Sequence, residues 1–407
     1  MRNYFNAIYF LLNTILYFTM LLKLRANEGL ESVGYFSMIY AYSTNLRLLD
    51  ITGNKIFLRF LNIKKINSTT IISKSGMSVI VFATSSNLIL SVLAILLIHF
   101  TIIIGTDFNP DIELFKLYPS IFMLVFGGAA MQFAATLCDK LNLTQIRLLC
   151  SYIVSFVLFI FVIYTPLNLS DLTLVLGLNI FVPSVIIWYL LSRRVNTYRI
   201  FRMRNVRNIK NIFTYSTHIW KINLLVGGFD PFLRFILLNT SGPILVAQFE
   251  FLSRPFSFAR RLIMSLIQPD LPVWASKIKT LRQISDIPAA MRETLYNKIY
   301  VVNFCLSVCL VPYFQYLEVI QEKLITVISL SIFLLVCFHC NVIVFLRYYY
   351  CQLRSQFWNL YIAHTAPLLI ILVCFFNVPK FDLILVILIL GGSWVLSSIP
   401  FMRIMRS

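Results

Sequence analysis

Charged residues interrupt an apolar stretch between residues 243 and 277. The stretch opens as Pro-Ile-Leu-Val-Ala and then contains Glu250, Arg254, Arg260 and Arg261. A charged side chain at the centre of a bilayer costs at least ~2.5–3.5 kcal/mol on insertion scales. Such residues are therefore expected either to face a polar pathway or to neutralise one another. Guanidinium groups bind phosphate in a bidentate manner, so an anion, particularly a diphosphate, suits this stretch better than an organic cation.

The preceding apolar segment, residues 211–240, is charged in the same way. It contains His218, Lys221, Asp230 and Arg234. Acid and base stand four apart in Asp230/Arg234 and in Glu250/Arg254, so each pair can meet along one helix face. Two interpretations stay open, because such pairs either contribute to a binding site or only lower the cost of insertion. Another basic residue, Arg47, lies three positions before an aspartate in an earlier span.

Depth in the membrane separates the arginines of the 243–277 stretch. If the helix enters from the outside at Pro243, Arg254 lies about 16 Å in, close to the bilayer midplane. Arg260 and Arg261 come about 25 Å in, where a basic side chain also reaches the cytoplasmic headgroups. Pro255 removes a backbone donor and is expected to kink the helix and free a carbonyl next to Arg254.

The composition indicates the elements that hold these residues. Hydrophobic residues make up 59% of the 407 residues, charged residues only 13%, and the mean hydropathy is +0.82. Since about 20 apolar residues cross a bilayer, these values predict an all-α polytopic membrane protein with twelve transmembrane helices. The candidate spans are 5–24, 32–53, 76–104, 117–138, 145–165, 170–191, 211–238, 243–267, 294–314, 322–346, 355–376 and 382–402.

The distribution of Lys and Arg predicts the orientation. With the N-terminus in the cytoplasm, nearly all basic residues outside the spans fall on the cytoplasmic side, as the positive-inside rule requires. The opposite side receives only Lys23, Arg25, Lys116, Lys323 and Lys380. Both termini are therefore predicted to be cytoplasmic, and the net charge of +19 is explained by loops that contact anionic lipids, without nucleic acid as a partner.

The longest basic loop divides the chain into two halves. We predict an N-terminal six-helix lobe at 1–192, a cytoplasmic linker at 193–210 and a C-terminal six-helix lobe at 211–407. Laying Val33-Gly-Tyr-Phe over Val246-Ala-Gln-Phe brings Arg47 onto Arg260 without a gap, which indicates an internal repeat.

Several function classes are disfavoured by the sequence. There is no P-loop and no catalytic or metal-binding arrangement of intramembrane residues, so neither an enzyme nor a cofactor is expected. Cys337-Phe-His339-Cys340 resembles a metal motif, but its side chains would point in different directions on one helix. External segments are short, which argues against a membrane-embedded glycan polymerase with a catalytic external loop.

Two stretches resemble bacterial O-antigen and polysaccharide translocases of the Wzx type, within the multidrug/oligosaccharidyl-lipid/polysaccharide exporter superfamily. They are Gly34-Tyr-Phe through Asp50-Ile-Thr-Gly to Arg59-Phe, and Val246-Ala-Gln-Phe-Glu-Phe-Leu-Ser-Arg254 through Pro269-Asp-Leu-Pro. The resemblance implies a MATE-like fold with two lobes around a central cavity, and alternating access. It also implies export of a lipid-diphosphate-linked oligosaccharide across the bacterial inner membrane, with a polysaccharide polymerase and a chain-length regulator as candidate partners.

The resemblance also suggests site residues. Arg47 and Arg254 match the cavity arginines expected of the family, and Lys221, Arg234, Glu250 and Arg260 complete the predicted substrate site. The alternative is a cation-coupled drug antiporter that uses Asp230 or Glu250 as its ion site. Aromatic side chains near this pathway either stack on sugar rings or pack in the core: Tyr35, Tyr40, Tyr42, Trp220, Phe249, Phe251, Phe256 and Phe258.

Overall fold

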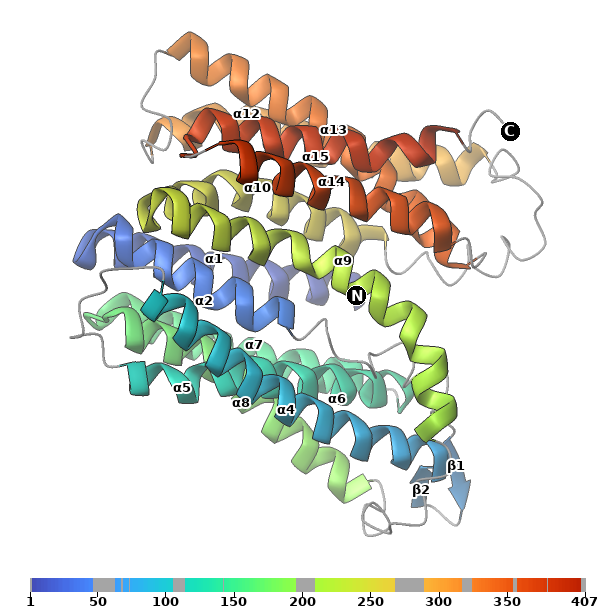
Figure 1. Ribbon diagram of the computed structural model, residues 1–407. Coiled ribbons are helices and arrows are strands. Elements are labelled where there is room, and N and C mark those ends of the chain that lie inside the picture. The colour runs from blue at the N-terminus through green and yellow to red at the C-terminus, as the bar shows by residue number, and fades with distance from the viewer. Residues whose placement is uncertain are drawn as a thin grey trace. The chain divides into compact units, whose positions relative to one another are not determined.

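The computed structural model is almost entirely helical (Figure 1). It describes residues 2–46, 63–66, 69–72, 74–104, 114–141, 143–194, 209–267, 289–316, 324–353, 357–378 and 380–403. The helices of the first half are α1 (Arg2–Glu28), α2 (Leu30–Leu46), α4 (Lys74–Ile104), α5 (Leu114–Phe122), α6 (Gly128–Lys140), α7 (Thr144–Tyr164) and α8 (Leu169–Arg194). Those of the second half are α9 (Ile209–Ser241), α10 (Pro243–Ile267), α12 (Ala289–Tyr316), α13 (Leu324–Leu353), α14 (Phe357–Asn377) and α15 (Leu383–Arg403).

A π-helical turn, η2 (Met123–Gly127), joins α5 to α6. Counted with that continuous segment as one, the described residues contain twelve helical segments, and each overlaps one predicted span. A small hairpin of β1 (Ile63–Ile66) and β2 (Thr69–Ile72), paired antiparallel with Ile63 opposite Ile72, was not predicted. Ile occurs twice in each strand and Thr twice in β2, and these β-branched side chains favour extended backbone.

Five helices of the described part are long and apolar enough to cross a membrane. They are Phe82–Thr101, Lys116–Cys138, Thr144–Tyr164, Leu169–Arg193 and Leu324–Val342, and shorter apolar helices occur at Ile299–Gln315, Tyr361–Asn377 and Leu383–Ile399. The charged residues of α10 exceed what such a helix ordinarily carries. The number of twelve spans and the cytoplasmic location of both termini stay predictions.

The surface of α7 has the polarity expected of a helix in lipid. Its buried face contains Ser151 and Ser155, whereas Phe156, Val157 and Ile160 are exposed. A soluble helix buries its apolar side chains and exposes the polar ones, so this reversal indicates a lipid-facing helix whose hydroxyl groups face protein.

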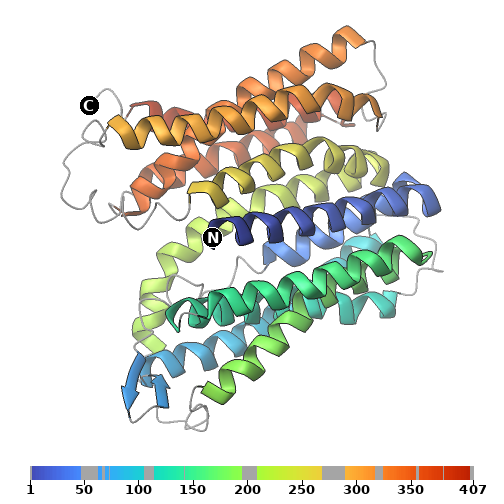
Figure 2. The same ribbon diagram turned by 180° about the vertical axis from the view of Figure 1, so that it is seen from behind.

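Contacts divide the chain into two compact units. Leu11–Phe235 forms one unit, and Met1–Phe10 with Ile236–Ser407 forms the other. In the first, α8 packs against α2, α5, η2, α6 and α7, and in the second, α15 packs against α10, α13 and α14 (Figures 1 and 2). This division at 235/236 differs from the boundary predicted at 193–210, of which residues 195–208 lie outside the described part, so the linker stays a prediction.

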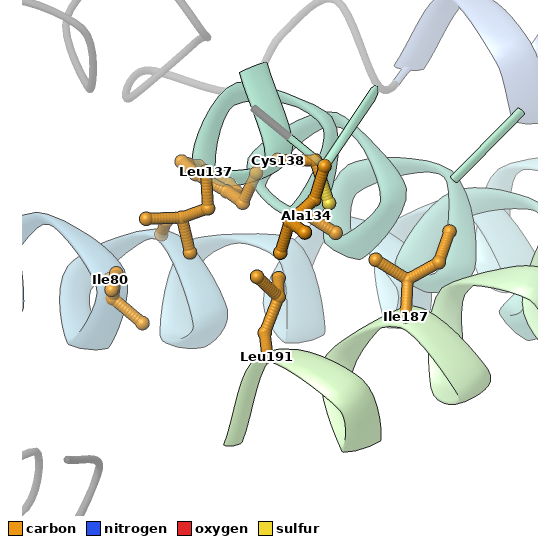
Figure 3. Packing of buried hydrophobic residues seen from close by; sticks show 9 residues of the cluster. Ile80, Ala134, Leu137, Cys138, Ile187 and Leu191 are labelled. Atoms are coloured by element: carbon orange, nitrogen blue, oxygen red, sulfur yellow. The ribbon is translucent and has the colours of Figure 1, made fainter. Parts of the chain in front are cut away.

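Close packing in each unit depends on small residues and branched aliphatic side chains. In the first unit, Ile80 of α4 meets Ala134 and Leu137 of α6 and Leu191 of α8 in one buried cluster (Figure 3). In the second unit, a Cβ placed on Gly391 of α15 would come within 2.5 Å of the Phe333 ring on α13. Small residues at such crossings let helix backbones approach, as is common in membrane helix packing.

The elements of the two halves recur at a constant spacing. Gly29 separates α1 from α2 and Gly242 separates α9 from α10, and both have φ +86°, a conformation that glycine adopts without strain. Their N–H groups donate to the carbonyls of Arg25 and Leu238, each at 3.1 Å. The number of residues between Gly29 and Gly242 equals the number between Val33 and Val246, so the two glycines are equivalent in the sequence overlay.

Candidate functional site

The polar residues of α10 begin with an ion pair. Glu250 is completely buried, and Nε of Arg254, one turn later, donates to Oε1 of Glu250. The Arg254 side chain is 16% exposed. The predicted pair therefore forms, with the carboxylate buried and part of the guanidinium accessible.

Pro255 breaks the hydrogen-bond ladder of α10 directly after this pair. A residue other than proline at this position would donate its N–H to the carbonyl of Phe251, four residues earlier. The hydroxyl of Tyr313 on α12 donates to that carbonyl instead, at 3.0 Å. The Phe251 carbonyl, to which Pro255 cannot donate, thus accepts from a residue of a different helix.

The two arginines near the end of α10 have different environments. Arg260 is half-buried and its Nη2 donates to Oδ1 of Asn341 on α13. Nδ2 of Asn341 lies 3.4 Å from the Ser397 hydroxyl on α15, so a polar chain links three helices of this unit. Arg261 is exposed. Depth in the membrane did not distinguish Arg260 from Arg261. Neighbouring residues of a helix point roughly 100° apart, so the two side chains face different surroundings.

Aromatic residues of α10 pack in the core. Phe249, Phe251 and Phe256 are each 1% exposed. The ring of Phe256 lies 5.3 Å from that of Phe338 and 5.2 Å from that of Trp394, between centroids. These contacts favour the packing interpretation over sugar stacking for the three phenylalanines.

In the unit Leu11–Phe235, Arg234 joins α9 to α2. Its side chain is 4% exposed, and Nε and Nη2 lie 3.2 and 3.3 Å from the two Asp230 carboxylate oxygens. Nη1 also donates to the hydroxyl of Ser37 on α2. The Asp230 side chain is 37% exposed. Lys221 lies exposed on α9, and Arg47 is outside the described residues.

A neutral polar cluster in this unit was not predicted. Nδ2 of Asn179 on α8 donates to Oδ1 of Asn13 on α1 at 2.7 Å, and the Ser155 hydroxyl on α7 donates to Oδ1 of Asn179 at 2.7 Å. Each of the three residues lies in a different predicted span that contains other polar residues as well, so the sequence did not single them out. Ser155 and Asn179 are buried and Asn13 is partly buried, so these hydrogen bonds satisfy polar groups that are largely removed from water.

The structure thus distributes the predicted site residues between the two units. Asp230, Arg234 and Lys221 belong to one unit, and Glu250, Arg254 and Arg260 belong to the other. In the described part of each unit, a carboxylate pairs with an arginine four residues later on the same helix.

Metal binding has no support in the described part of the chain. No group of three or more His, Cys, Asp or Glu residues gathers there. His339, the centre of the metal-like motif, lies with Nδ1 at 2.8 Å from Nδ2 of Asn303 on α12.

No family model and no curated protein matches the sequence. Solved structures do match its fold. An outward-facing multidrug resistance MATE family transporter of the MOP superfamily shares 16% identity at a TM-score of 0.57, over 100% of this chain and 96% of its own. A MATE protein in complex with MaD3S shares 14% identity at a TM-score of 0.58, over 99% of this chain and 95% of its own.

A third match is a MOP superfamily transporter from Pyrococcus furiosus, for which a reverse polarity of the binding pocket suggests a different function. It shares 15% identity at a TM-score of 0.59, over 99% of this chain and 94% of its own. These likenesses define the class of fold. The chain has an almost entirely helical, MATE-like fold that matches these structures over its whole length.

Proposed function

We propose that this protein is a flippase that moves a lipid-diphosphate-linked oligosaccharide, an O-antigen or related surface polysaccharide unit, across the bacterial inner membrane by alternating access. The charge of α10 carries the proposal. This helix contains three arginines and one glutamate. After Glu250 and Arg254 neutralise each other, the remaining formal charge of the helix is positive.

A diphosphate matches this charge. Each guanidinium offers five N–H donors in a planar fork, which fits two phosphate oxygens at once. Desolvation strengthens the contact, since charge-assisted hydrogen bonds gain from a low local dielectric. Arg254, partly accessible beside the proline break, and half-buried Arg260 are the proposed phosphate ligands. We assign Arg234 a mainly structural role, because its side chain is only 4% exposed and hydrogen-bonds to both Asp230 and Ser37.

The second candidate function is a cation-coupled drug antiporter. Asp230 favours it, because its side chain is 37% exposed and is accessible to an ion. A multidrug resistance transporter has the same fold, which also supports this candidate function. Against it, both predicted coupling carboxylates are engaged by arginine, which competes with a proton or cation for the same oxygens. The buried cluster on α1, α7 and α8 consists of neutral amides and a hydroxyl.

Pocket polarity is a reasonable basis for separating functions within this fold. For the Pyrococcus furiosus transporter, reversed polarity of the binding pocket was taken to suggest a different function. The arginine-rich α10 supports a comparable argument here. The proposed partners are membrane lipids, the lipid-linked oligosaccharide and, in the same process, a polysaccharide polymerase and a chain-length regulator.

Deletion of the gene tests the proposal. The expected result is accumulation of a lipid-linked oligosaccharide on the cytoplasmic face, with unchanged drug susceptibility. Complementation with Glu250→Gln/Arg254→Gln, which leaves no unpaired buried charge, is expected to leave the accumulation in place, whereas Arg261→Ala, at an exposed position of the same helix, restores export. Increased drug susceptibility without lipid-linked oligosaccharide would instead favour the antiporter.

A further inference from the structure

Helix α10 contacts different helices before and after Pro255. Before the proline, the carbonyl of Phe251 accepts from Tyr313 of α12. After it, Phe256 packs against Phe338 of α13 and Trp394 of α15. The proline therefore lies between a segment attached to α12 and a segment attached to α13 and α15.

The Tyr313 contact acts directly on the backbone of α10. It is a hydroxyl-to-carbonyl hydrogen bond between two helices, at 3.0 Å. Beyond the proline, three buried aromatic rings and the Arg260 to Asn341 hydrogen bond attach α10 to α13 and α15. A bend at the proline would therefore change the distance between the Tyr313 hydroxyl and the Phe251 carbonyl.

The same tyrosine binds the backbone next to the ion pair of α10. Phe251, whose carbonyl it binds, directly follows Glu250 in the chain. A change in the Tyr313 contact would therefore move the backbone that positions the ion pair.

We propose that Tyr313 is a positioning residue for the α10 site. Its hydroxyl replaces the backbone donor that Pro255 removes. The helix bends between Phe251 and Pro255 during the transport cycle, and the Tyr313 hydrogen bond stabilises one of the two conformations. A helix without this proline would lack the flexible point. The inference deepens the proposed function and rests on it for the transport readout only, because the bond itself is testable without any substrate.

A double-mutant cycle separates positioning from simple stabilisation. Tyr313→Phe removes the donor, and Pro255→Ala supplies a backbone N–H that can bind the Phe251 carbonyl instead. The full-length protein in detergent is expected to lose at least about 2 °C of melting temperature on Tyr313→Phe. In the Pro255→Ala background the same change is expected to have little effect. Tyr300→Phe, at a 56% exposed position of α12, is the control.

Export in the complemented deletion strain provides the second readout. The double variant, folded as stably as wild type, is expected to export at least about tenfold more slowly, the change for a barrier raised by about 1.4 kcal/mol. Wild-type export by the double variant would overturn the positioning role. Equal losses of melting temperature from Tyr313→Phe in both backgrounds would overturn the contact itself. Failure of the proposed function would abolish the export readout for wild type as well, and would leave the melting-temperature cycle as the test of the bond.

Discussion

Replacing Glu250 and Arg254 together with neutral residues tests whether Arg254 binds substrate or only neutralises the glutamate. Glu250 is completely buried and accepts from Arg254. Arg254→Gln alone leaves a buried carboxylate without its cation, which costs about 3–5 kcal/mol. That is a large part of the ~5–15 kcal/mol by which proteins are typically stable. We expect little of this variant in the membrane.

The double variant Glu250→Gln/Arg254→Gln removes that cost. No charge remains at the pair, and two amides can still hydrogen-bond one turn apart. Replacing a buried ion pair with well-packed apolar residues of similar volume is often close to neutral in stability, and a hydrogen-bonded pair of amides likewise leaves no unpaired charge. The double variant is therefore expected to accumulate in the membrane as wild type does, and to melt at a similar temperature in detergent.

Export by the double variant gives the decisive comparison. Each 1.4 kcal/mol of lost substrate binding lowers affinity tenfold, and a charge-assisted hydrogen bond contributes ~1.5–3 kcal/mol. Loss of Arg254 as a phosphate ligand should thus reduce export by at least about tenfold. The assay is surface polysaccharide in the complemented deletion strain, normalised to the amount of membrane protein. Normal export by a well-expressed double variant would refute a substrate role for Arg254.

Other variants test the remaining features. Arg260→Ala is expected to reduce export strongly and Arg261→Ala hardly at all, since the first is half-buried and bound by α13 whereas the second is exposed; equal export levels would contradict that distinction. Arg234→Ala should lower the melting temperature less than Arg254→Ala, because the Asp230 carboxylate that it leaves is 37% exposed; the reverse order in a detergent melt would be evidence against this explanation. Gly391→Ala should destabilise the protein by about 1–3 kcal/mol through overpacking against α13, and an unchanged melt would indicate that the neighbouring ring moves aside.

The sequence predicted the features of this protein that depend on local chemistry. Pro255 has no N–H, so the loss of one backbone donor within α10 followed from the covalent structure alone. The four-residue spacing likewise predicted the Glu250/Arg254 pair. The helical architecture followed from apolar runs long enough to cross a bilayer.

Long-range partners did not follow from the sequence. Tyr313 lies 62 residues from Phe251, and Ser37 lies 197 residues from Arg234. No periodicity indicates which of many polar residues in apolar helices will face one another. The sequence also did not show that Phe256 packs in the core, because sugar stacking and core packing both use aromatic side chains and these are abundant in the chain.

Transport in reconstituted liposomes tests the central claim most directly. The purified full-length protein is placed in liposomes that contain a polyprenyl-diphosphate-linked oligosaccharide, and its movement between leaflets is followed by access of an impermeant lectin or glycosidase. We predict that wild type moves the lipid-linked sugar much faster than protein-free liposomes do, and that Glu250→Gln/Arg254→Gln does not. Movement no faster than in protein-free liposomes, together with proton- or sodium-driven uptake of a cationic drug by the same preparation, would contradict the proposed function.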